Sequence, residues 1–350
     1  MEYIALGSMS GTSLDGIDLS IIKSNGRDSF QEIDNLFEPY SNDLKDQIQK
    51  TLSDGYLINP NLPTLISNEY ISSIDKIITK NKSLKIDILG IHGQTIFHDE
   101  KLKISLQIFN KKIITNSYPF TISNFRKNDL LNGGYGAPII PIFHQLLSNK
   151  FQINNCVFVN IGGVTNITII RNKNLKAYDL CFGNSLSDDL IRAHNKKFSY
   201  DKDGCYSFNG SLNKKLEDII YSDKFFRRDP PKTLDRNYFH KYFSDLNSYS
   251  QNSLENTLYT LWYILSSEIL EYSKDCKVIL CGGGRKNKTL LDILTKRHGN
   301  VIDIDDLGLD GDFIEAQGMA YLAIRRLLKI PSTFKGTTGI NKDVYLGEIN

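Results

Sequence analysis

Three glycine-rich turns, each directly after an apolar run, are the segments of this 350-residue sequence best suited to chemistry. The first turn is Gly7–Ser13 (GSMSGTS), the second is Gly162-Gly163, and the third is Gly282-Gly283-Gly284. Glycine lets the backbone turn sharply and present N–H groups to an anion without a side chain in the way. One such turn is more often a tight hairpin than a phosphate cradle. Three of them at predicted strand ends favour phosphate binding, although their spacings match neither the P-loop nor the dinucleotide-binding motif.

Acidic residues lie beside these turns. Asp15 and Asp18 follow the first turn, Asp179 precedes Gly183-Asn184, and Glu315 begins a predicted late helix. Phosphoryl transfer needs such groups to hold Mg²⁺ and to activate or orient the acceptor. Each acid also has a structural interpretation, as a turn residue, a strand-end ion pair or an acid favoured by a helix dipole. Turns and acids together indicate an ATP-binding α/β protein, of which a kinase is one kind.

The elements that position the turns repeat in two halves. In the first half, strands at Tyr3–Leu6 and Ile17–Ile22 flank the first turn; in the second half, strands at Cys156–Ile161 and Thr165–Ile170 flank the second turn. Buried-strand runs and helices with apolar stripes follow in each half, at Ile86–Ile91, Lys277–Cys281, Asn61–Lys80, Leu254–Leu270 and Glu315–Leu328. This repetition predicts an internal duplication in an α/β fold, with a cleft between two domains.

The composition excludes several classes of function. The net charge is +2, from 42 basic and 40 acidic residues, so there is no electrostatic footprint for nucleic acid. No apolar run approaches the roughly 20 residues that span a bilayer, and the first residues do not form a signal peptide. The five cysteines are scattered and show no zinc or redox spacing. The sequence therefore predicts a cytoplasmic protein that binds neither membrane nor nucleic acid.

The string Gly7–Asp18 (GSMSGTSLDGID) resembles the opening signature of the anhydro-N-acetylmuramic acid kinases. Other segments resemble the same family in the same order, and the match runs from about residue 4 to the C-terminus. These segments are Ile91–His98 (IHGQTIFH), Asn160–Thr168 (NIGGVTNIT), Pro230-Pro231-Lys232 with Arg236, Cys281–Asn287 (CGGGRKN) and Glu315–Ala323 (EAQGMAYLA).

The resemblance implies the fold of the acetate and sugar kinase, Hsp70 and actin superfamily. That fold has two related RNase H-like (actin-like ATPase) domains with an interdomain active-site cleft. We expect an N-terminal domain at 1–125, a C-terminal domain at 126–329, and a tail at 330–350 that returns to the first. The implied reaction uses ATP and Mg²⁺ to phosphorylate O6 of anhydro-N-acetylmuramic acid while water opens the 1,6-anhydro ring. Its products are N-acetylmuramic acid 6-phosphate and ADP, in peptidoglycan recycling.

The resemblance also implies roles for single residues. Asp179 matches the family's catalytic aspartate, a general base toward the attacking water, and Asp15 is expected to contact Mg²⁺ through water. Arg126 suits the lactyl carboxylate of the substrate, because a guanidinium pairs bidentately with a carboxylate. The expected ATP-binding residues are Gly7, Ser10, Gly11, Thr12, Ser13, Asp15, Gly16, Gly162, Gly163, Asn166, Gly282, Gly283 and Gly284. The expected sugar-binding residues are His92, Gln94, Thr95, His98, Arg126, Asn184 and Glu315.

Three departures from the family pattern lie on the sugar side and leave alternatives open. Leu180-Cys181-Phe182 replaces the usual Thr-Gly-Pro, Asn124 replaces the aspartate of a DFR segment, and Thr233-Leu234-Asp235 replaces Ser-Thr-Gly. The alternatives are a kinase for another anhydro-sugar, such as levoglucosan, and a non-catalytic nucleotide or sugar sensor. Retention of Asp179 and Glu315 favours an active kinase. Such kinases commonly form homodimers, but no segment of the sequence marks an interface.

Overall fold

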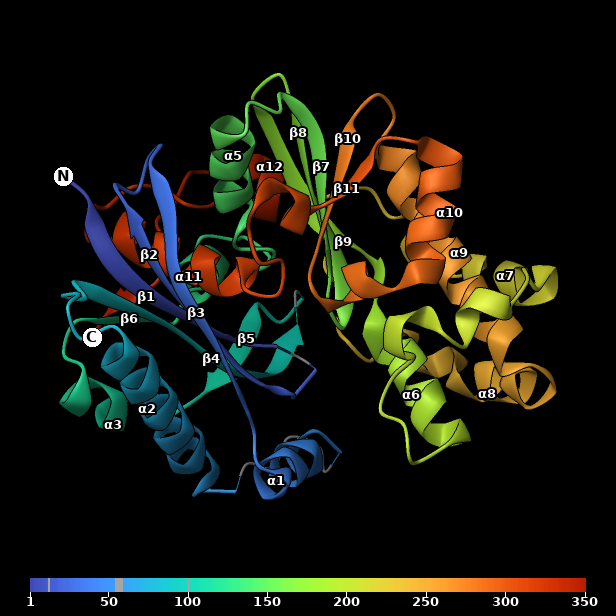
Figure 1. Ribbon diagram of the computed structural model, residues 1–350, viewed down its shortest axis with the longest axis horizontal. Helices are drawn as coiled ribbons and strands as arrows, with labels where there is room; N and C mark the ends of the chain where they lie inside the picture. The colour runs from blue at the N-terminus through green and yellow to red at the C-terminus, as the bar shows by residue number, and fades with distance from the viewer. Residues whose placement is uncertain (12, 54–58, 100) are drawn as a thin grey trace. The chain divides into compact units, whose positions relative to one another are not determined.

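The computed structural model describes residues 1–11, 13–53, 59–99 and 101–350, which form two compact units (Figure 1). Unit 1 comprises Met1–Gln152 and Asp312–Asn350, and unit 2 comprises Ile153–Gly311. The sequence analysis places the boundaries after residues 125 and 329, whereas the compact units divide after residues 152 and 311. The difference at the second boundary arises because helix α11 (Ile314–Leu327) packs on strands of unit 1.

The sheet of unit 1 contains the two strands, β1 and β2, that flank the first glycine turn. Strand β1 runs antiparallel to β2, which runs antiparallel to β3, while β1, β4 and β6 run parallel to one another. The strand order is β12-β6-β4-β1-β2-β3, and β5 pairs with β4. The strands are β1 (Tyr3–Ser10), β2 (Gly16–Ser24), β3 (Phe30–Pro39), β4 (Ile88–Asp99), β5 (Ile104–Ile108), β6 (Thr121–Ser123) and β12 (Glu348–Ile349).

The sheet of unit 2 repeats this plan. Its order is β11-β10-β7-β8-β9, with β7, β8 and β9 antiparallel in succession and β7, β10 and β11 parallel. The strands are β7 (Asn155–Ile161), β8 (Val164–Arg171), β9 (Asn174–Phe182), β10 (Lys277–Cys281) and β11 (Val301–Asp303). The path β9-β8-β7-β10-β11 matches β3-β2-β1-β4-β6 strand for strand, in order and in direction. The predicted duplication and the predicted fold class are confirmed.

Helices cover the sheets where the sequence predicts apolar stripes. In α2 (Leu62–Lys80) the residues Ile66, Tyr70, Ile74 and Ile77 are fully buried. The other helices of unit 1 are α1 (Asn42–Ser53), α3 (Lys111–Ser117), α4 (Lys127–Leu131), α5 (Pro141–Lys150) and α12 (Lys335–Thr338). In unit 2, the apolar stripe of α9 (Leu254–Tyr272) shares one hydrophobic core with the strands of the sheet. The other helices that contribute to this core are α6 (Asn184–His194), α7 (Lys214–Tyr221), α8 (Phe243–Asn252) and α10 (Lys288–His298). Among the described residues, no helix has the length and apolarity needed to cross a bilayer.

Helix α11 lies unusually close to the sheet of unit 1. A Cβ atom on Gly7 of β1 would lie 2.1 Å from the carbonyl oxygen of Ala316, and one on Gly90 of β4 would lie 2.6 Å from that of Met319. Only glycine at these two strand positions lets the helix backbone approach so closely. The close contact brings the first turn of α11, which carries Glu315, to the strand that leads into the first glycine turn.

Candidate active site

The first glycine turn divides its residues between strand and loop. Gly7 and Ser10 lie within β1, and Gly16 begins β2. Between the strands, Ser13 and Asp15 are exposed, and the Ser13 hydroxyl donates to Asp15 Oδ1 at 2.7 Å. Thr12 lies outside the described residues. The side chains that this turn presents to solvent are therefore a hydroxyl and a carboxylate.

Ser10 is fully buried, and its hydroxyl bonds within the protein. Its Oγ lies 2.8 Å from the Tyr70 hydroxyl and donates to the Gly93 carbonyl at 3.2 Å. Burial raises the pKa of Tyr70 to about 12, so the phenol stays neutral at physiological pH. The Ser10 side chain thus ties β1 to α2 and β4.

Gln94 binds the same turn from β4. Its Nε2 donates to the Gly11 carbonyl at 3.1 Å, while its Oε1 accepts from the Tyr40 hydroxyl at 3.3 Å. Gln94 is fully buried, and burial raises the pKa of Tyr40 well above its usual value. Gln94, expected at the sugar, binds the backbone of the first glycine turn through Gly11.

Buried His92 and partly buried Arg126 form a hydrogen-bonded pair in unit 1. Arg126 Nε donates to His92 Nε2 at 3.2 Å, and His92 Nδ1 lies 2.9 Å from the Gly93 carbonyl. Since a guanidinium only donates, Nε2 must accept, and the hydrogen bonds assign the ring proton to Nδ1. Burial and the Arg126 charge lower the pKa of His92 to about 3, so this histidine is neutral. It orients Arg126 and cannot serve as a general acid.

The loop Gly133–Gly136 holds the other side of Arg126. Arg126 Nη1 donates to the Gly136 carbonyl at 2.9 Å, and the Gly136 N–H donates to Asp129 Oδ2 at 2.7 Å. Asp129 is fully buried and also accepts from the Thr338 hydroxyl at 2.6 Å. Burial raises the pKa of Asp129, which these hydrogen bonds offset in part. The C-terminal segment therefore helps to orient Arg126.

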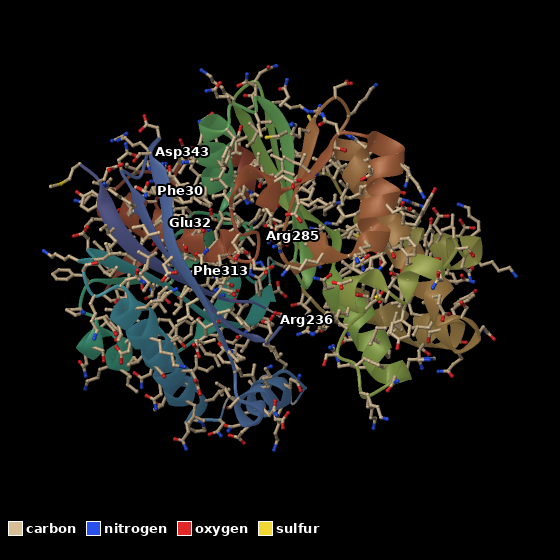
Figure 2. All side chains as sticks on the ribbon, in the orientation of Figure 1. Phe30, Glu32, Arg236, Arg285, Phe313 and Asp343 are labelled. Atoms are coloured by element: carbon tan, nitrogen blue, oxygen red, sulfur yellow. The ribbon has the colours of Figure 1, made fainter. Side chains whose placement is uncertain are left out.

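The remaining residues expected at the sugar in unit 1 are more dispersed. Thr95 Oγ1 accepts from Gln107 of β5 at 3.4 Å, and His98 pairs with Ser105 further along the same two strands. Glu315 lies partly buried in the first turn of α11. Two residues further on, the Gln317 amide donates to Glu32, which Figure 2 labels together with Phe313.

Asn124 faces the C-terminal strand. Its Nδ2 donates to Glu348 Oε2 at 2.7 Å, and Lys127 forms an ion pair with the other oxygen of Glu348 at 2.7 Å. An aspartate at position 124 would repel Glu348. This contact explains why an amide suits the position, and it shows that the departure from DFR is compensated within unit 1.

In unit 2, the carbonyl groups of the second glycine turn accept hydrogen bonds from the start of α6. The Gly162 carbonyl accepts from the Asn184 N–H at 2.8 Å, and the Gly163 carbonyl accepts from the Gly183 N–H at 3.1 Å. The hydroxyl of Ser185 adds a bond to the Gly163 carbonyl at 2.7 Å. Because C=O and N–H point in opposite directions in a trans peptide, the Gly163 N–H faces away from the helix.

The third glycine turn packs against the second. A Cβ atom on Gly284 would lie 2.1 Å from Ile161 Cγ2 and 2.9 Å from Asn184 Oδ1. Asn184 Nδ2 in turn donates to the Ile161 carbonyl at 3.2 Å. The structure thus brings together two of the three turns that the sequence assigns to the nucleotide. Asn184, expected at the sugar, holds them in contact.

Asp179 lies near the end of β9 and is 7% exposed. Its Oδ2 accepts from the Leu234 N–H at 2.9 Å, and its own N–H donates to the Lys232 carbonyl at 3.0 Å. Across the ladder it pairs with Asn166, whose buried Oδ1 has no hydrogen-bond partner among the described residues. The Pro230–Leu234 segment therefore fixes the orientation of one carboxylate oxygen.

The bulky residues after Asp179 belong to the core. Leu180 is fully buried, and the ring of Phe182 packs edge-on against Phe239 with centroids 5.3 Å apart. Strand β9 continues through Phe182, so the segment is a strand and not a ligand-binding loop. The replacement of Thr-Gly-Pro by larger residues thus fills the core of unit 2 rather than the surroundings of the carboxylate.

Two partly buried charge clusters in unit 2 were missed in the sequence. In one, Asp189 binds Arg192 and lies 2.5 Å from His240 Nε2, while burial raises the pKa of nearby Asp188 to about 7. Coulombic interactions link both aspartates to Arg236, the arginine of the PPK…R segment. In the other, Arg285 directly follows the third glycine turn. Two features of the sequence could have indicated this cluster: the position of Arg285 in CGGGRKN, and the four aspartates within Asp303–Asp310.

The comparisons with known proteins identify a family over the whole chain. The family model described as "Anhydro-N-acetylmuramic acid kinase" matches residues 2–350. A protein of that name from Pelagibacter ubique is 40% identical over 97% of this chain and 96% of its own length. Another, from Sulfurimonas denitrificans, is 31% identical over 100% of both chains.

Among solved structures, the (R)-2-hydroxyglutaryl-CoA dehydratase component A of Acidaminococcus fermentans aligns with a TM-score of 0.50 at 11% identity. The alignment covers 93% of this chain and 100% of that one, and at this identity it supports the fold alone. With the family match over nearly every residue, the conclusion is direct: the chain belongs to the anhydro-N-acetylmuramic acid kinase family and is a kinase.

Proposed function

We propose that this kinase opens the 1,6-anhydro ring of anhydro-N-acetylmuramic acid with water and phosphorylates O6 with ATP, in peptidoglycan recycling. Family membership supports the substrate and the use of ATP. The observation that carries the chemistry is the Asp179 carboxylate, nearly buried and oriented by the Leu234 N–H. Such recycling takes place in the cytoplasm, and a homodimer stays a prediction that light scattering would test.

Asp179 is the proposed general base. The Leu234 N–H orients its Oδ2, and an ionised carboxylate is an acceptor that can hold a water molecule and take its proton. As Asp179 takes a proton, the water oxygen bonds to C1 and the C1–O6 bond breaks. The electron pair released on O6 attacks the γ-phosphorus, and ADP leaves. The products are N-acetylmuramic acid 6-phosphate and ADP, and the proton remains on Asp179 until it is lost to solvent.

The glycine turns are the proposed nucleotide contacts. In unit 2, the Gly163 N–H points away from α6, and the exposed Gly283 lies in the adjacent third turn. In unit 1, Ser13 and Asp15 are exposed at the first turn. Mg²⁺ neutralises phosphate charge when bound, and it commonly takes one or two carboxylates besides phosphates and water. Asp15 fits that requirement.

Arg126 is the proposed partner of the lactyl carboxylate. A guanidinium suits this ligand because its planar fork matches both oxygens of a carboxylate. Hydrogen bonds to neutral His92 and to Gly136 hold Arg126 in one orientation without neutralising its charge. A neutral anhydro-sugar such as levoglucosan has no carboxylate for this guanidinium to bind. The oriented guanidinium supports the proposal of the acidic sugar over the alternative substrate.

An isotope experiment tests the proposed chemistry. The enzyme is incubated with ATP, Mg²⁺ and anhydro-N-acetylmuramic acid in H₂¹⁸O, and the sugar phosphate is analysed by mass spectrometry. The account predicts one ¹⁸O at C1 and none in the phosphoryl group. A phosphorylated product without sugar label would mean that no water opens the ring. Absence of any product, with ATP still bound, would favour the sensor alternative.

A further inference from the structure

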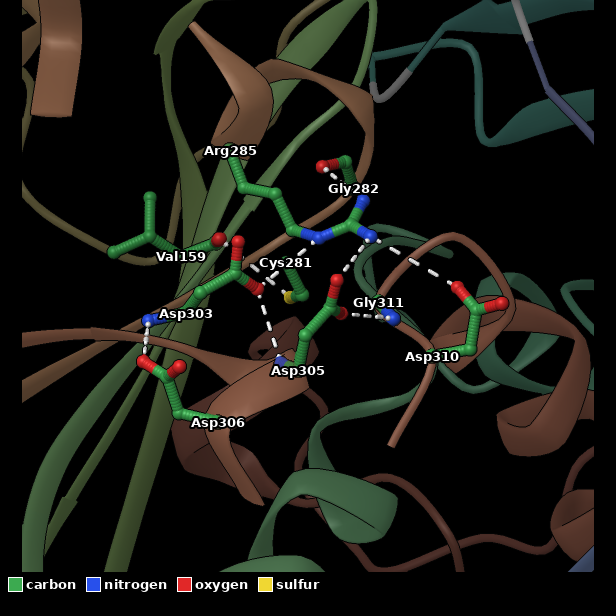
Figure 3. Close-up of polar contacts among 9 residues, drawn as sticks. All are labelled: Val159, Cys281, Gly282, Arg285, Asp303, Asp305, Asp306, Asp310 and Gly311. Carbon is green, nitrogen blue, oxygen red and sulfur yellow. Dashed lines mark hydrogen bonds and ion pairs between the residues drawn. The ribbon is translucent and has the colours of Figure 1, made fainter. Parts of the chain in front are cut away.

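Arg285 is an unusually buried charge beside the third glycine turn. It is 2% exposed, and its guanidinium contacts three aspartates, one at the end of β11 and two in the segment that follows it (Figure 3). Its Nε donates to Asp303 Oδ1 at 3.1 Å, its Nη2 donates to Asp305 Oδ2 at 2.9 Å, and Asp310 lies 3.8 Å from Nη2. A buried charge persists only when it is paired this well, because its desolvation costs several kcal/mol.

The same guanidinium reaches the glycine turn itself. Arg285 Nη1 donates to the Gly282 carbonyl at 3.3 Å, and the Gly282 N–H donates to the Gly311 carbonyl at 3.1 Å. The Gly282 carbonyl shares a peptide with the Gly283 N–H, and the two point in opposite directions. Holding the carbonyl therefore directs the Gly283 N–H to the other side of the turn. Gly283 is exposed, and a Cβ atom there would have only Asn184 Nδ2 within 4.0 Å.

Gly311 closes the arrangement from the far side. Its N–H donates to Asp305 Oδ1 at 2.8 Å, so Asp305 bridges Arg285 and the backbone of Gly311. A Cβ atom on Gly311 would lie 2.4 Å from Arg285 Nε and 2.8 Å from its Cζ. The guanidinium thus lies directly over the Gly311 backbone. Hydrogen bonds of the Arg285 side chain therefore connect the third turn to the segment Asp303–Gly311.

Arg285 also sets the local charge. Asp303, Asp305 and Asp310 would otherwise place three carboxylates next to a turn that is proposed to meet a nucleotide polyanion. With Arg285 present, one of these charges is compensated, and the other two belong to side chains that are 49% and 44% exposed. Both the orientation of the Gly283 N–H and the compensation of charge by Arg285 favour the binding of an anion at the third glycine turn.

We propose that Arg285 is a positioning residue for the nucleotide: it fixes the third glycine turn so that the Gly283 N–H faces the ligand. This inference rests on the proposed role of Gly282–Gly284 in ATP binding. A purely structural Arg285 would affect the stability of unit 2 and leave nucleotide affinity unchanged once the protein is folded. A positioning residue instead changes ATP affinity while affinity for the sugar is retained.

The test compares Arg285→Met, Arg285→Lys and wild type by calorimetric titration with ATP and Mg²⁺, a measurement that requires no turnover. We expect Arg285→Met to weaken ATP binding by about tenfold or more, the loss expected for one charge-assisted hydrogen bond. Lysine keeps the charge but cannot span all the acceptors, so it should restore part of the affinity. Arg297→Met is the matched control, because Arg297 is an exposed arginine that donates to Ser266 and Ser267.

Further readouts separate the possible failures. The Michaelis constant for the sugar should stay within about twofold of wild type while that for ATP rises. If Arg285→Met does not fold, Gly311→Ala, which displaces the guanidinium, should weaken ATP binding in its place. Unchanged ATP affinity in every folded variant would overturn the positioning role. Wild type that binds ATP but shows no turnover with any anhydro-sugar would refute the proposed function and leave the Arg285 comparison intact.

Discussion

At the scale of single residues, the hydrogen-bonded pair of Arg126 and His92 combines a charged guanidinium with a neutral imidazole. His92 is expected to remain neutral with its proton on Nδ1, since burial and Arg126 lower its pKa to about 3. ¹⁵N-detected NMR of histidine-labelled protein, with His92→Gln to assign the signal, should show the Nδ1–H tautomer unchanged from pH 8 to pH 5.5. An imidazolium at pH 6, or an Nε2–H tautomer, would contradict the arrangement.

Arg126 carries the second residue-scale prediction. Arg126→Ala should raise the Michaelis constant for anhydro-N-acetylmuramic acid by about 10- to 100-fold, the range for a hydrogen-bonded charge pair. The constant for levoglucosan, which lacks a carboxylate, should change little. Arg126→Lys keeps the charge and is the matched control, with an intermediate effect on the acidic sugar. Equal losses for both sugars would show that Arg126 maintains structure and does not recognise the carboxylate.

Single residues also show what a sequence can and cannot predict. The glycine turns and Asp179 were identified because they belong to contiguous motifs. The sequence predicts Ser10 at ATP, whereas its hydroxyl bonds to Tyr70, 60 residues further along the chain, a long-range contact that no local motif shows. Arg285 was missed for the same reason, since its carboxylate partners follow a later strand. Motifs identify which residues matter, whereas long-range contacts decide the task of each.

At the scale of elements, the close contact of α11 with β1 and β4 depends on glycine at Gly7 and Gly90. Gly7→Ala should destabilise the protein by at least about 3 kcal/mol, because the added carbon meets helix backbone that cannot move aside. Gly299→Ala is the control: it has open space around it but a positive φ of 75°, and should cost only about 1–2 kcal/mol. Chemical denaturation of both variants measures the difference. Similar losses would mean that α11 does not pack this closely.

Elements with strong local patterns were predicted, and those defined by tertiary contacts were not. The stripe of α2 and the hairpins β1–β2 and β7–β8 have clear apolar periodicity. Strand β3 was missed because Phe30–Pro39 is half exposed and rich in polar residues. The placement of α11 in unit 1 depends on Gly7 and Gly90, which a local pattern cannot connect to a helix more than 200 residues away.

At the scale of the whole molecule, buried Glu268 makes stability depend on pH. Burial raises its pKa from 4.5 to about 7, although Lys232 nearby acts in the other direction. Between these values the folded state binds more protons than the unfolded state, so the contribution of Glu268 to stability falls as pH rises from about 4.5 to 7.

A variant pair isolates this effect from the other titrating groups. Glu268→Gln should gain stability relative to wild type as pH rises through this window, and the gain should level off above pH 7. Glu271→Gln, on the exposed side of the same helix, removes only the smallest of the influences on the pKa of Glu268 and should stay close to the wild-type profile. Urea denaturation at pH 5, 6, 7 and 8 provides the comparison. A constant difference between Glu268→Gln and wild type would show that Glu268 is ionised throughout.

The central claim is that the oriented Asp179 carboxylate activates water during phosphoryl transfer to the sugar. Asp179→Asn tests it, because an amide oxygen can still accept from the Leu234 N–H while the basic group is lost. Asp218→Asn, on the exposed face of α7, controls for the substitution itself.

The decisive measurement is ADP release with anhydro-N-acetylmuramic acid, ATP and Mg²⁺ in these three proteins. The account predicts turnover in wild type and Asp218→Asn, and a loss of about 10²- to 10⁴-fold in Asp179→Asn with ATP affinity retained. Turnover by Asp179→Asn at the wild-type rate would contradict it.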